Sequence, residues 1–206
     1  MENKKTACDN EQCPNNQNGF CDKKQESLRE TNARIIAIEC KSFYRVFCDI
    51  ESHILPFWEK FRKGKLDEAA YEEEKLYQGP YIVNGAFAAE LALKYLLELA
   101  NIDYSKGNKG HKLKYLFDLL LLNKAEIRKD KDNIVDLLCK DGTQTLETLK
   151  INIEAWSDCY NRYRYLFSYN SAGTNGVFPV FVHTVCKYTI SKFEELKEKD
   201  ACEGEI

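Results

Sequence analysis

The chain has 206 residues, of which 44 % are hydrophobic and 31 % are charged, ordinary proportions for a folded soluble protein. Its formal net charge is −3, so no overall positive field draws it to nucleic acid, and any such binding must depend on a local patch. No apolar run approaches the roughly 20 residues of a membrane span. The polar stretch 1–18 does not resemble a secretory signal, so we expect a cytoplasmic protein.

Nine cysteines are many for such a chain, and in a reducing compartment they are more typical of thiols or metal ligands than of disulfides. Three of them crowd the first 21 residues, namely Cys8, Cys13 and Cys21. The other six are scattered, and for most of these we expect the role of a small buried apolar residue.

The N-terminal segment 1–24 has almost no large apolar side chain, so it cannot form a core and is expected to be disordered or held by a metal. A helical pattern covers 25–63, and Pro56 is expected to bend or break it. The acidic stretch 66–76 reads as a short solvated helix or a loop. One face of the first helix carries Phe43, Val46, Phe47, Ile50 and Ile54.

Gly79-Pro80 is expected to separate this region from the strongest helix, 81–100, on which Glu90 and Lys94 form an i, i+4 pair. A polar loop, 101–110, follows. A short helix then has Leu113, Leu116, Phe117 and Leu120 on its inner face. A weaker helix covers 124–140 and is closed by Asp141-Gly142. Its acidic residues Asp130, Asp132 and Asp136 read as a solvated face.

A long helix is predicted over 143–169, with one apolar face formed by Leu149, Ile153, Trp156, Tyr160, Tyr163 and Phe167. Arg162 points away from that face, whereas Arg164 lies only about 60° from its centre. After a turn at 171–176, the last helix covers 178–197, and a charged tail, 198–206, is expected to fray. No strand pattern occurs, so the sequence predicts an all-α, up-and-down helical bundle of about five core helices.

Three segments resemble the HEPN superfamily, small α-helical domains of prokaryotic defence, toxin–antitoxin and RNA-processing systems. The stretch 83–94 (VNGAFAAELALK) is similar to the family's small-residue helix ending in Glu-Leu-x-Leu-Lys. The stretch 110–120 (GHKLKYLFDLL) is similar to its Gly-His-x-Leu-x-x-Leu-Phe motif, and Tyr163-Arg164-Tyr165 to its Trp-Arg-Tyr. The resemblance covers about residues 80–198 and implies a helical bundle that forms a homodimer.

Many HEPN proteins are metal-independent ribonucleases in which a histidine follows an arginine after four to six residues. No histidine follows Arg162 or Arg164 at that spacing. Arg45 and His53 are separated by seven residues and lie outside the matched region. The resemblance therefore implies a catalytically silent binding branch, because the imidazole needed for proton transfer is missing from its usual place.

The N-terminal cysteines resemble a small bacterial cysteine-rich domain of unknown function, through Cys8, Cys13, Asn16, Cys21 and Cys40 before Ser42-Phe43. Four thiolates suit tetrahedral Zn²⁺. The resemblance implies a zinc site at Cys8, Cys13, Cys21 and Cys40, and the alternative is a flexible tail with incidental thiols. The predicted organisation is thus a cysteine-rich extension (1–40), a HEPN-like bundle (41–198) and a charged tail (199–206).

The candidate ligand-binding residues are two arginines, a tyrosine that could stack on a base, and a basic loop that contains a histidine. Arginine offers a fork of donors to phosphate and tyrosine a face for a base, but Arg164 could equally form a structural ion pair with Glu90 or Asp118. His111 begins a helix among lysines and could bind an anion, or else cap or pack. His183 reads as a buried, hydrogen-bonded histidine. The predicted set is Arg162, Arg164, Tyr165, His111, Lys112 and Glu90.

Three functions remain open at this point. The first is a non-catalytic module that binds RNA, a nucleotide or a partner protein in a bacterial defence, stress or toxin–antitoxin system, phage defence included. The second is an atypical ribonuclease that combines Arg164 with Asn170, or with His111 brought close by folding. The third is a scaffold, for instance the helical partner of a nucleotidyltransferase.

Overall fold

A computed structural model describes residues 22–65, 68–105, 107–122, 125–140, 142, 144–157 and 176–203. Within these ranges the chain forms six α-helices and one 3-10 helix, and no strand. The prediction of an all-α helical bundle is therefore confirmed. No helix in these ranges has the length and apolar character to cross a membrane.

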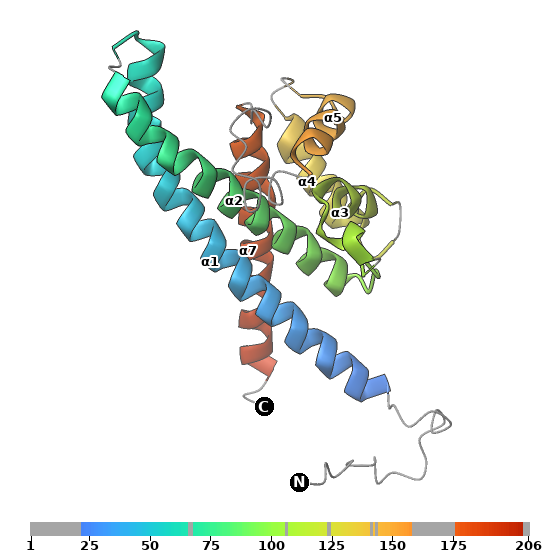
Figure 1. The fold of residues 1–206 in the computed structure, drawn as a ribbon. Helices are drawn as coiled ribbons and strands as arrows, with labels where there is room; N and C mark the ends of the chain where they lie inside the picture. Colours follow the sequence, from blue (N-terminus) through green and yellow to red (C-terminus); the bar gives the residue numbers. More distant parts are fainter. Residues whose placement is uncertain are drawn as a thin grey trace, which may run out of the picture.

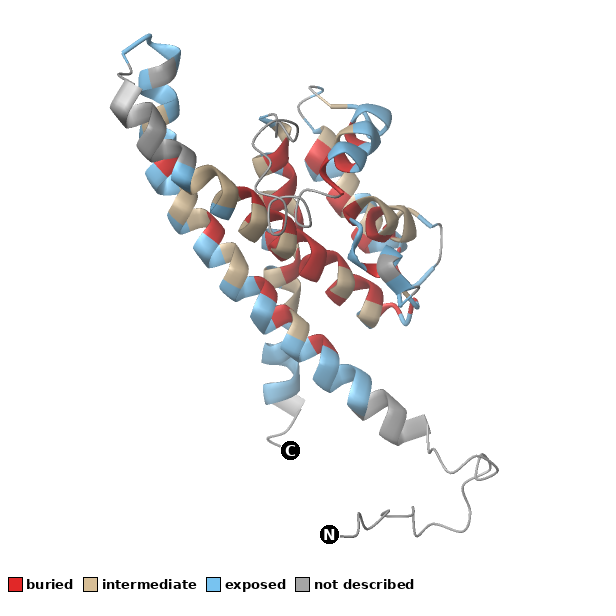
Figure 2. Ribbon diagram, viewed as in Figure 1, coloured by how far each residue is buried: buried red, intermediate tan, exposed pale blue. Residues whose placement is uncertain are grey.

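Two long helices, α1 (Asp22–Arg62) and α2 (Glu68–Leu99), lie side by side (Figure 1). The last helix, α7 (Val177–Glu203), crosses them and contacts both. Three shorter helices, α3 (Leu113–Leu120), α4 (Arg128–Cys139) and α5 (Leu146–Trp156), complete the fold, and the 3-10 helix η2 (Gly107–His111) precedes α3. The core lies along the second half of α2 and where α7 crosses it, as the buried residues in Figure 2 show.

Small residues let the long helices approach closely. Ala86, Ala88, Ala89 and Ala92 of α2 are almost completely buried. Gly85 faces the rings of Phe47 and Phe178, and a Cβ atom there would lie 2.7 Å from the nearer ring. A side chain at this position would therefore separate α2 from α1.

The two prolines do not end the helices in which they lie. α1 continues past Pro56 to Arg62, and α2 runs through Gly79-Pro80, where we expected an interruption. Both prolines are exposed, so the carbonyl oxygens that lose an amide partner can bind water instead. At Pro80 its own carbonyl also accepts a hydrogen bond from Asn84 Nδ2, at 2.7 Å. The predicted separate segment 66–76 is thus largely part of α2.

Other boundaries also differ from the prediction. The helix expected over 143–169 begins at Leu146, with Thr145 in a capping box, and ends at Trp156; residues 158–175 lie outside the described part. The tail expected to fray from 198 is helical to Glu203, and Asp200 within it forms a 2.6 Å ion pair with Arg34 of α1. α1 also runs without interruption across residue 40, where the predicted extension ends.

Candidate functional site

A buried carboxylate on α2 organises the basic loop that precedes α3. Glu90 has a side chain only 2 % exposed, and its Oε1 accepts hydrogen bonds from Lys94 Nζ at 2.7 Å and His111 Nδ1 at 2.9 Å. The predicted Glu90–Lys94 pair is therefore present, and folding adds His111 to it. We call Glu90, Lys94 and His111 the carboxylate–histidine cluster.

The cluster leaves the imidazole accessible. The His111 side chain is 59 % exposed, although Glu90 beneath it is buried. Nδ1 faces a carboxylate, which can only accept, so the ring proton lies on Nδ1. The Nε2 atom is then left to accept a hydrogen bond from a ligand or, when the ring is charged, to donate one. Lys109 and Lys112 beside it are exposed. A cationic surface thus surrounds an imidazole of fixed orientation.

The start of α3 depends on another helix for its cap. Lys112 is at its N-cap position and makes no side-chain capping bond. Ser157, at the C-cap of α5, supplies the missing acceptor, since its Oγ receives the Lys114 amide at 2.8 Å. The chain therefore leaves α5 next to the segment that carries His111 and Lys112.

Several predicted site residues lie outside the described part of the chain. These are Arg162, Arg164 and Tyr165, together with Cys8, Cys13 and Cys21. The two carboxylates considered as partners of Arg164 have other partners, because Glu90 binds Lys94 and His111 while Asp118 binds Lys114 at 2.9 Å. The Arg164 predictions stay predictions.

Cys40 is the one proposed zinc ligand that can be placed. It is completely buried, and its Sγ lies 3.5 Å from the Ala88 carbonyl oxygen, to which it donates. No group of three or more His, Cys, Asp or Glu side chains suited to a metal ion occurs in the described ranges. A zinc site at the four cysteines therefore stays a prediction. The Cys40 thiol that it requires is buried in the core and already hydrogen-bonded to the Ala88 carbonyl.

A second histidine joins three helices. His183 of α7 accepts a hydrogen bond from Tyr44 of α1 at Nδ1, over 2.7 Å, and its Nε2 lies 2.6 Å from Glu51 Oε2. Tyr81 of α2 donates to the other oxygen of Glu51 at 3.0 Å. The histidine is hydrogen-bonded, as predicted, but its side chain is 28 % exposed rather than buried.

This second group does not supply an activated nucleophile. Burial raises the pKa of Tyr44 and of Tyr81 well above their usual range, so both hydroxyls keep their protons. Burial likewise raises the pKa of the nearby Cys48 thiol. Polar side chains that satisfy one another's hydrogen bonds are typical of a structural connection between helices, and we assign this group to packing of α1, α2 and α7.

The expectation of a solvated acidic face on α4 is wrong for Asp130. That residue is 5 % exposed, and both carboxylate oxygens lie 2.6 Å from Lys192 Nζ of α7. Tyr188 also donates to it, at 2.7 Å. Sequence reasoning missed this site because the lysine-rich neighbourhood masks the inward position, although Asp130 is four residues before the buried Ile134.

No model of a known protein family, no curated protein and no solved structure matches this chain. The function has therefore to be argued from the site itself.

Proposed function

We propose that the chain is a HEPN-like helical module that binds the phosphate groups of RNA or of a nucleotide at the carboxylate–histidine cluster. The observation that supports this is the exposed His111 ring held by the buried Glu90 carboxylate. The exposed Lys109 and Lys112 place positive charge on the same loop as this ring. Phosphate groups are recognised by such local clusters even where net charge is negative.

The arginines predicted from the sequence extend this proposal. Arg162, Arg164 and Tyr165 follow Ser157 in the chain, and Ser157 is hydrogen-bonded to the first turn of α3. Guanidinium groups and a tyrosine ring would serve the phosphates and bases of the same ligand. Replacement of either arginine by alanine is expected to weaken binding, and only Arg164→Ala is expected to lower the melting temperature as well.

The test is binding of a short, fluorescently labelled single-stranded RNA, followed by anisotropy at several salt concentrations. His111→Ala and Lys112→Ala should each weaken binding by about threefold to tenfold at low salt, because each removes one phosphate contact. Lys112→Ala should also lower the slope of log affinity against log salt by about one. His53→Ala and Lys187→Ala are matched controls, since both residues are exposed and lie on other helices.

The controls should bind RNA as the unchanged protein does. Unaltered RNA binding in both the His111 and the Lys112 variants would contradict a phosphate site at this cluster.

A ribonuclease is a second candidate function, and the geometry of His111 favours it over other enzymes. An imidazole oriented by a carboxylate is the arrangement that general acid–base catalysis uses. In this reading His111 removes the proton of the ribose 2′-hydroxyl, whose oxygen attacks phosphorus to form a 2′,3′-cyclic phosphate, while the 5′-oxygen leaves and takes a proton from water. Cleavage of RNA without added metal, lost in His111→Ala but kept in His53→Ala, would favour this candidate; intact RNA at high protein concentration would exclude it.

A further inference from the structure

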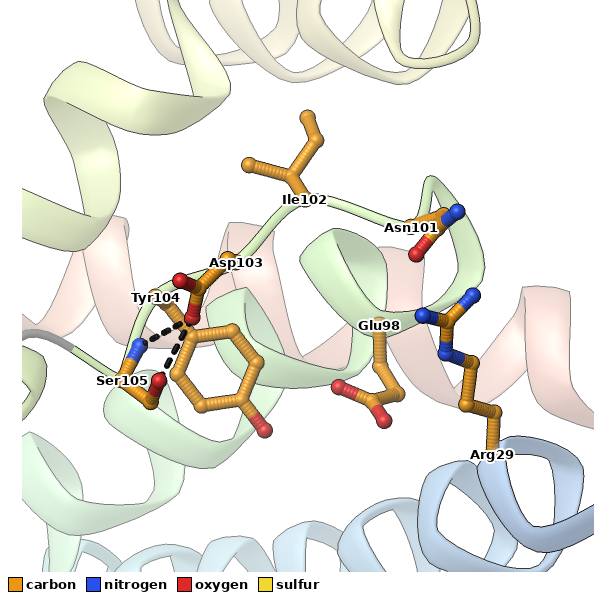
Figure 3. A pocket seen from close by; sticks show the side chains of 7 residues that line it. All are labelled: Arg29, Glu98, Asn101, Ile102, Asp103, Tyr104 and Ser105. Carbon is orange, nitrogen blue, oxygen red and sulfur yellow. Dashed lines mark hydrogen bonds between the residues drawn. The ribbon is translucent and has the colours of Figure 1, made fainter. Parts of the chain in front are cut away.

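A cavity of about 330 Å³ opens between α1 and the segment that follows α2, outside the carboxylate–histidine cluster (Figure 3). Its volume is at the lower end of the roughly 300–1,000 Å³ of ligand pockets. The lining residues come from three short stretches of chain: Arg29, Glu98, Asn101, Ile102, Asp103, Tyr104 and Ser105.

The wall of this cavity is held in a fixed shape. Asn101 has a φ of 52°, a left-handed conformation that asparagine tolerates better than most residues. Ile102 is buried, and its amide donates to the Leu97 carbonyl at 2.9 Å. Asp103 Oδ1 accepts from both the amide and the hydroxyl of Ser105, at 2.8 and 2.6 Å. A preformed wall lowers the cost of ordering it around a ligand.

The cavity is lined by side chains of opposite charge. In Figure 3 the guanidinium of Arg29 extends from α1 toward Asn101, and the carboxylate of Glu98 extends from α2 toward the side of the cavity lined by Tyr104. No ion pair joins them among the described contacts, and Glu98 accepts a hydrogen bond from the Tyr104 hydroxyl. Because a carboxylate has two oxygens and can accept several hydrogen bonds, both charged groups can still serve a ligand that offers hydrogen-bond acceptors and donors.

Tyr104 adds an aromatic wall. Its ring lines the cavity, while Lys94, which does not line it, lies with its ammonium 5.8 Å from the ring centre. Burial, followed by the charge and hydrogen bonding of Glu98, raises the pKa of Tyr104 to about 12, so the ring stays neutral at physiological pH. A neutral aromatic ring is a platform on which a nucleobase stacks.

Among the four RNA bases, guanine alone matches this set of groups. Its O6 and N7 atoms accept the paired donors of an arginine, and its N1–H and exocyclic amine are two adjacent donors for a carboxylate. Adenine and cytosine lack the adjacent pair of donors, and uracil has no amine.

We propose that this cavity binds a guanine base, stacked on Tyr104, with Arg29 at O6 and N7 and Glu98 at the N1 and N2 donors. The inference rests on the proposed function, because contacts run from Tyr104 through Lys94 to Glu90 and His111. The proposal puts the base of a bound guanine nucleotide in the cavity and directs its phosphate toward His111.

The experiment is calorimetric titration of the full chain with GMP, IMP, AMP, CMP and UMP. GMP should bind at least about tenfold more tightly than the other four, because IMP lacks the exocyclic amine and the rest lack more of the pattern. Glu98→Gln should remove the difference between GMP and IMP, and Arg29→Ala should weaken GMP at least about tenfold. Arg45→Ala and Glu147→Gln, at exposed positions elsewhere, are the matched controls.

The outcomes separate this inference from the proposed function. Equal affinities for the five nucleotides, absence of nucleotide binding, or GMP binding that survives both Arg29→Ala and Glu98→Gln in folded protein would overturn the guanine site. RNA binding that still depends on His111 would then leave the phosphate site standing. Selective GMP binding together with RNA binding that ignores His111 and Lys112 would instead remove the phosphate site.

Discussion

At the scale of single residues, buried charges decide where the short helices dock. Asp130 of α4 and Lys192 of α7 form one of the least exposed ion pairs of the described chain, with side chains 7 % and 28 % exposed. Tyr188 completes the site, and its pKa is raised to about 12 by burial and by the hydrogen bond to Asp130. Removing Asp130 leaves the half-buried Lys192 ammonium and the Tyr188 hydroxyl without the carboxylate to which they donate, which costs more than the intact pair contributes.

We therefore predict that Asp130→Ala lowers the free energy of unfolding by about 2–4 kcal/mol, measured by urea denaturation. Asp132→Ala should change it by less than about 0.5 kcal/mol, because that side chain is 56 % exposed. Equal losses in the two variants would contradict the docking role of Asp130.

Residue-level prediction from the sequence succeeds where neighbours on one helix decide the outcome. The Glu90–Lys94 pair is of that kind, and it is present. It fails where a distant helix supplies the partner. The sequence around Asp130 does not predict its contact with Lys192. The sequence around Glu90 likewise does not predict its contact with His111, which is 21 positions away. Such contacts depend on how the helices pack, which no local pattern contains.

At the scale of helices, one glycine fixes the distance between α1 and α2. Glycine normally weakens a helix, so Gly85→Ala would stabilise α2 by about 1 kcal/mol if the helix were isolated. The added Cβ would meet the fully buried Phe47 ring at 2.7–2.8 Å and the Phe178 ring at 3.1 Å. Neither ring has free space into which to move.

We predict that Gly85→Ala destabilises the protein by about 1–3 kcal/mol, because overpacking outweighs the gain in helix propensity. Thermal unfolding of Gly85→Ala, Phe47→Leu and the double variant measures the coupling between the two positions. The double variant should lose less stability than the sum of the single losses. Simple additivity would show that the rings do not limit the approach of the helices.

Periodicity predicts the helices well and their ends poorly. The four apolar residues expected on the inner face of α3 are its four buried residues, since a short amphipathic pattern has one stable orientation. The predicted helix breaks at Pro56 and at Gly79-Pro80 are absent, because a long packed helix tolerates a local loss of hydrogen bonding at an exposed position. The end of α7 also differs from the expectation, because the helix continues through the charged residues to Glu203.

At the scale of the whole molecule, the two tryptophans report on opposite parts of the fold. Trp58 of α1 is 40 % exposed, whereas Trp156 of α5 is 1 % exposed and lies edge-on to Phe178 of α7, with ring centroids 5.4 Å apart. Trp156 therefore depends on the docking of α5 against α7.

In Trp58→Phe protein, we expect blue-shifted emission that acrylamide quenches weakly, because only the buried Trp156 remains. Trp156→Phe protein should emit further to the red and be quenched strongly. The reverse pattern, measured by steady-state fluorescence on folded samples, would show that α5 does not pack against α7 as described.

Helix α7 contacts α1, α2, α4 and α5, yet it is the last of the described elements in the chain. A ribosome releases the earlier helices first, so their apolar faces emerge before the segment that covers them. Closure of the core has to wait for the buried residues of α7, which run from Phe178 to Thr189. A nascent chain stalled before residue 177 would therefore expose apolar helix faces to which chaperones bind. It could complete its core only after translation resumed.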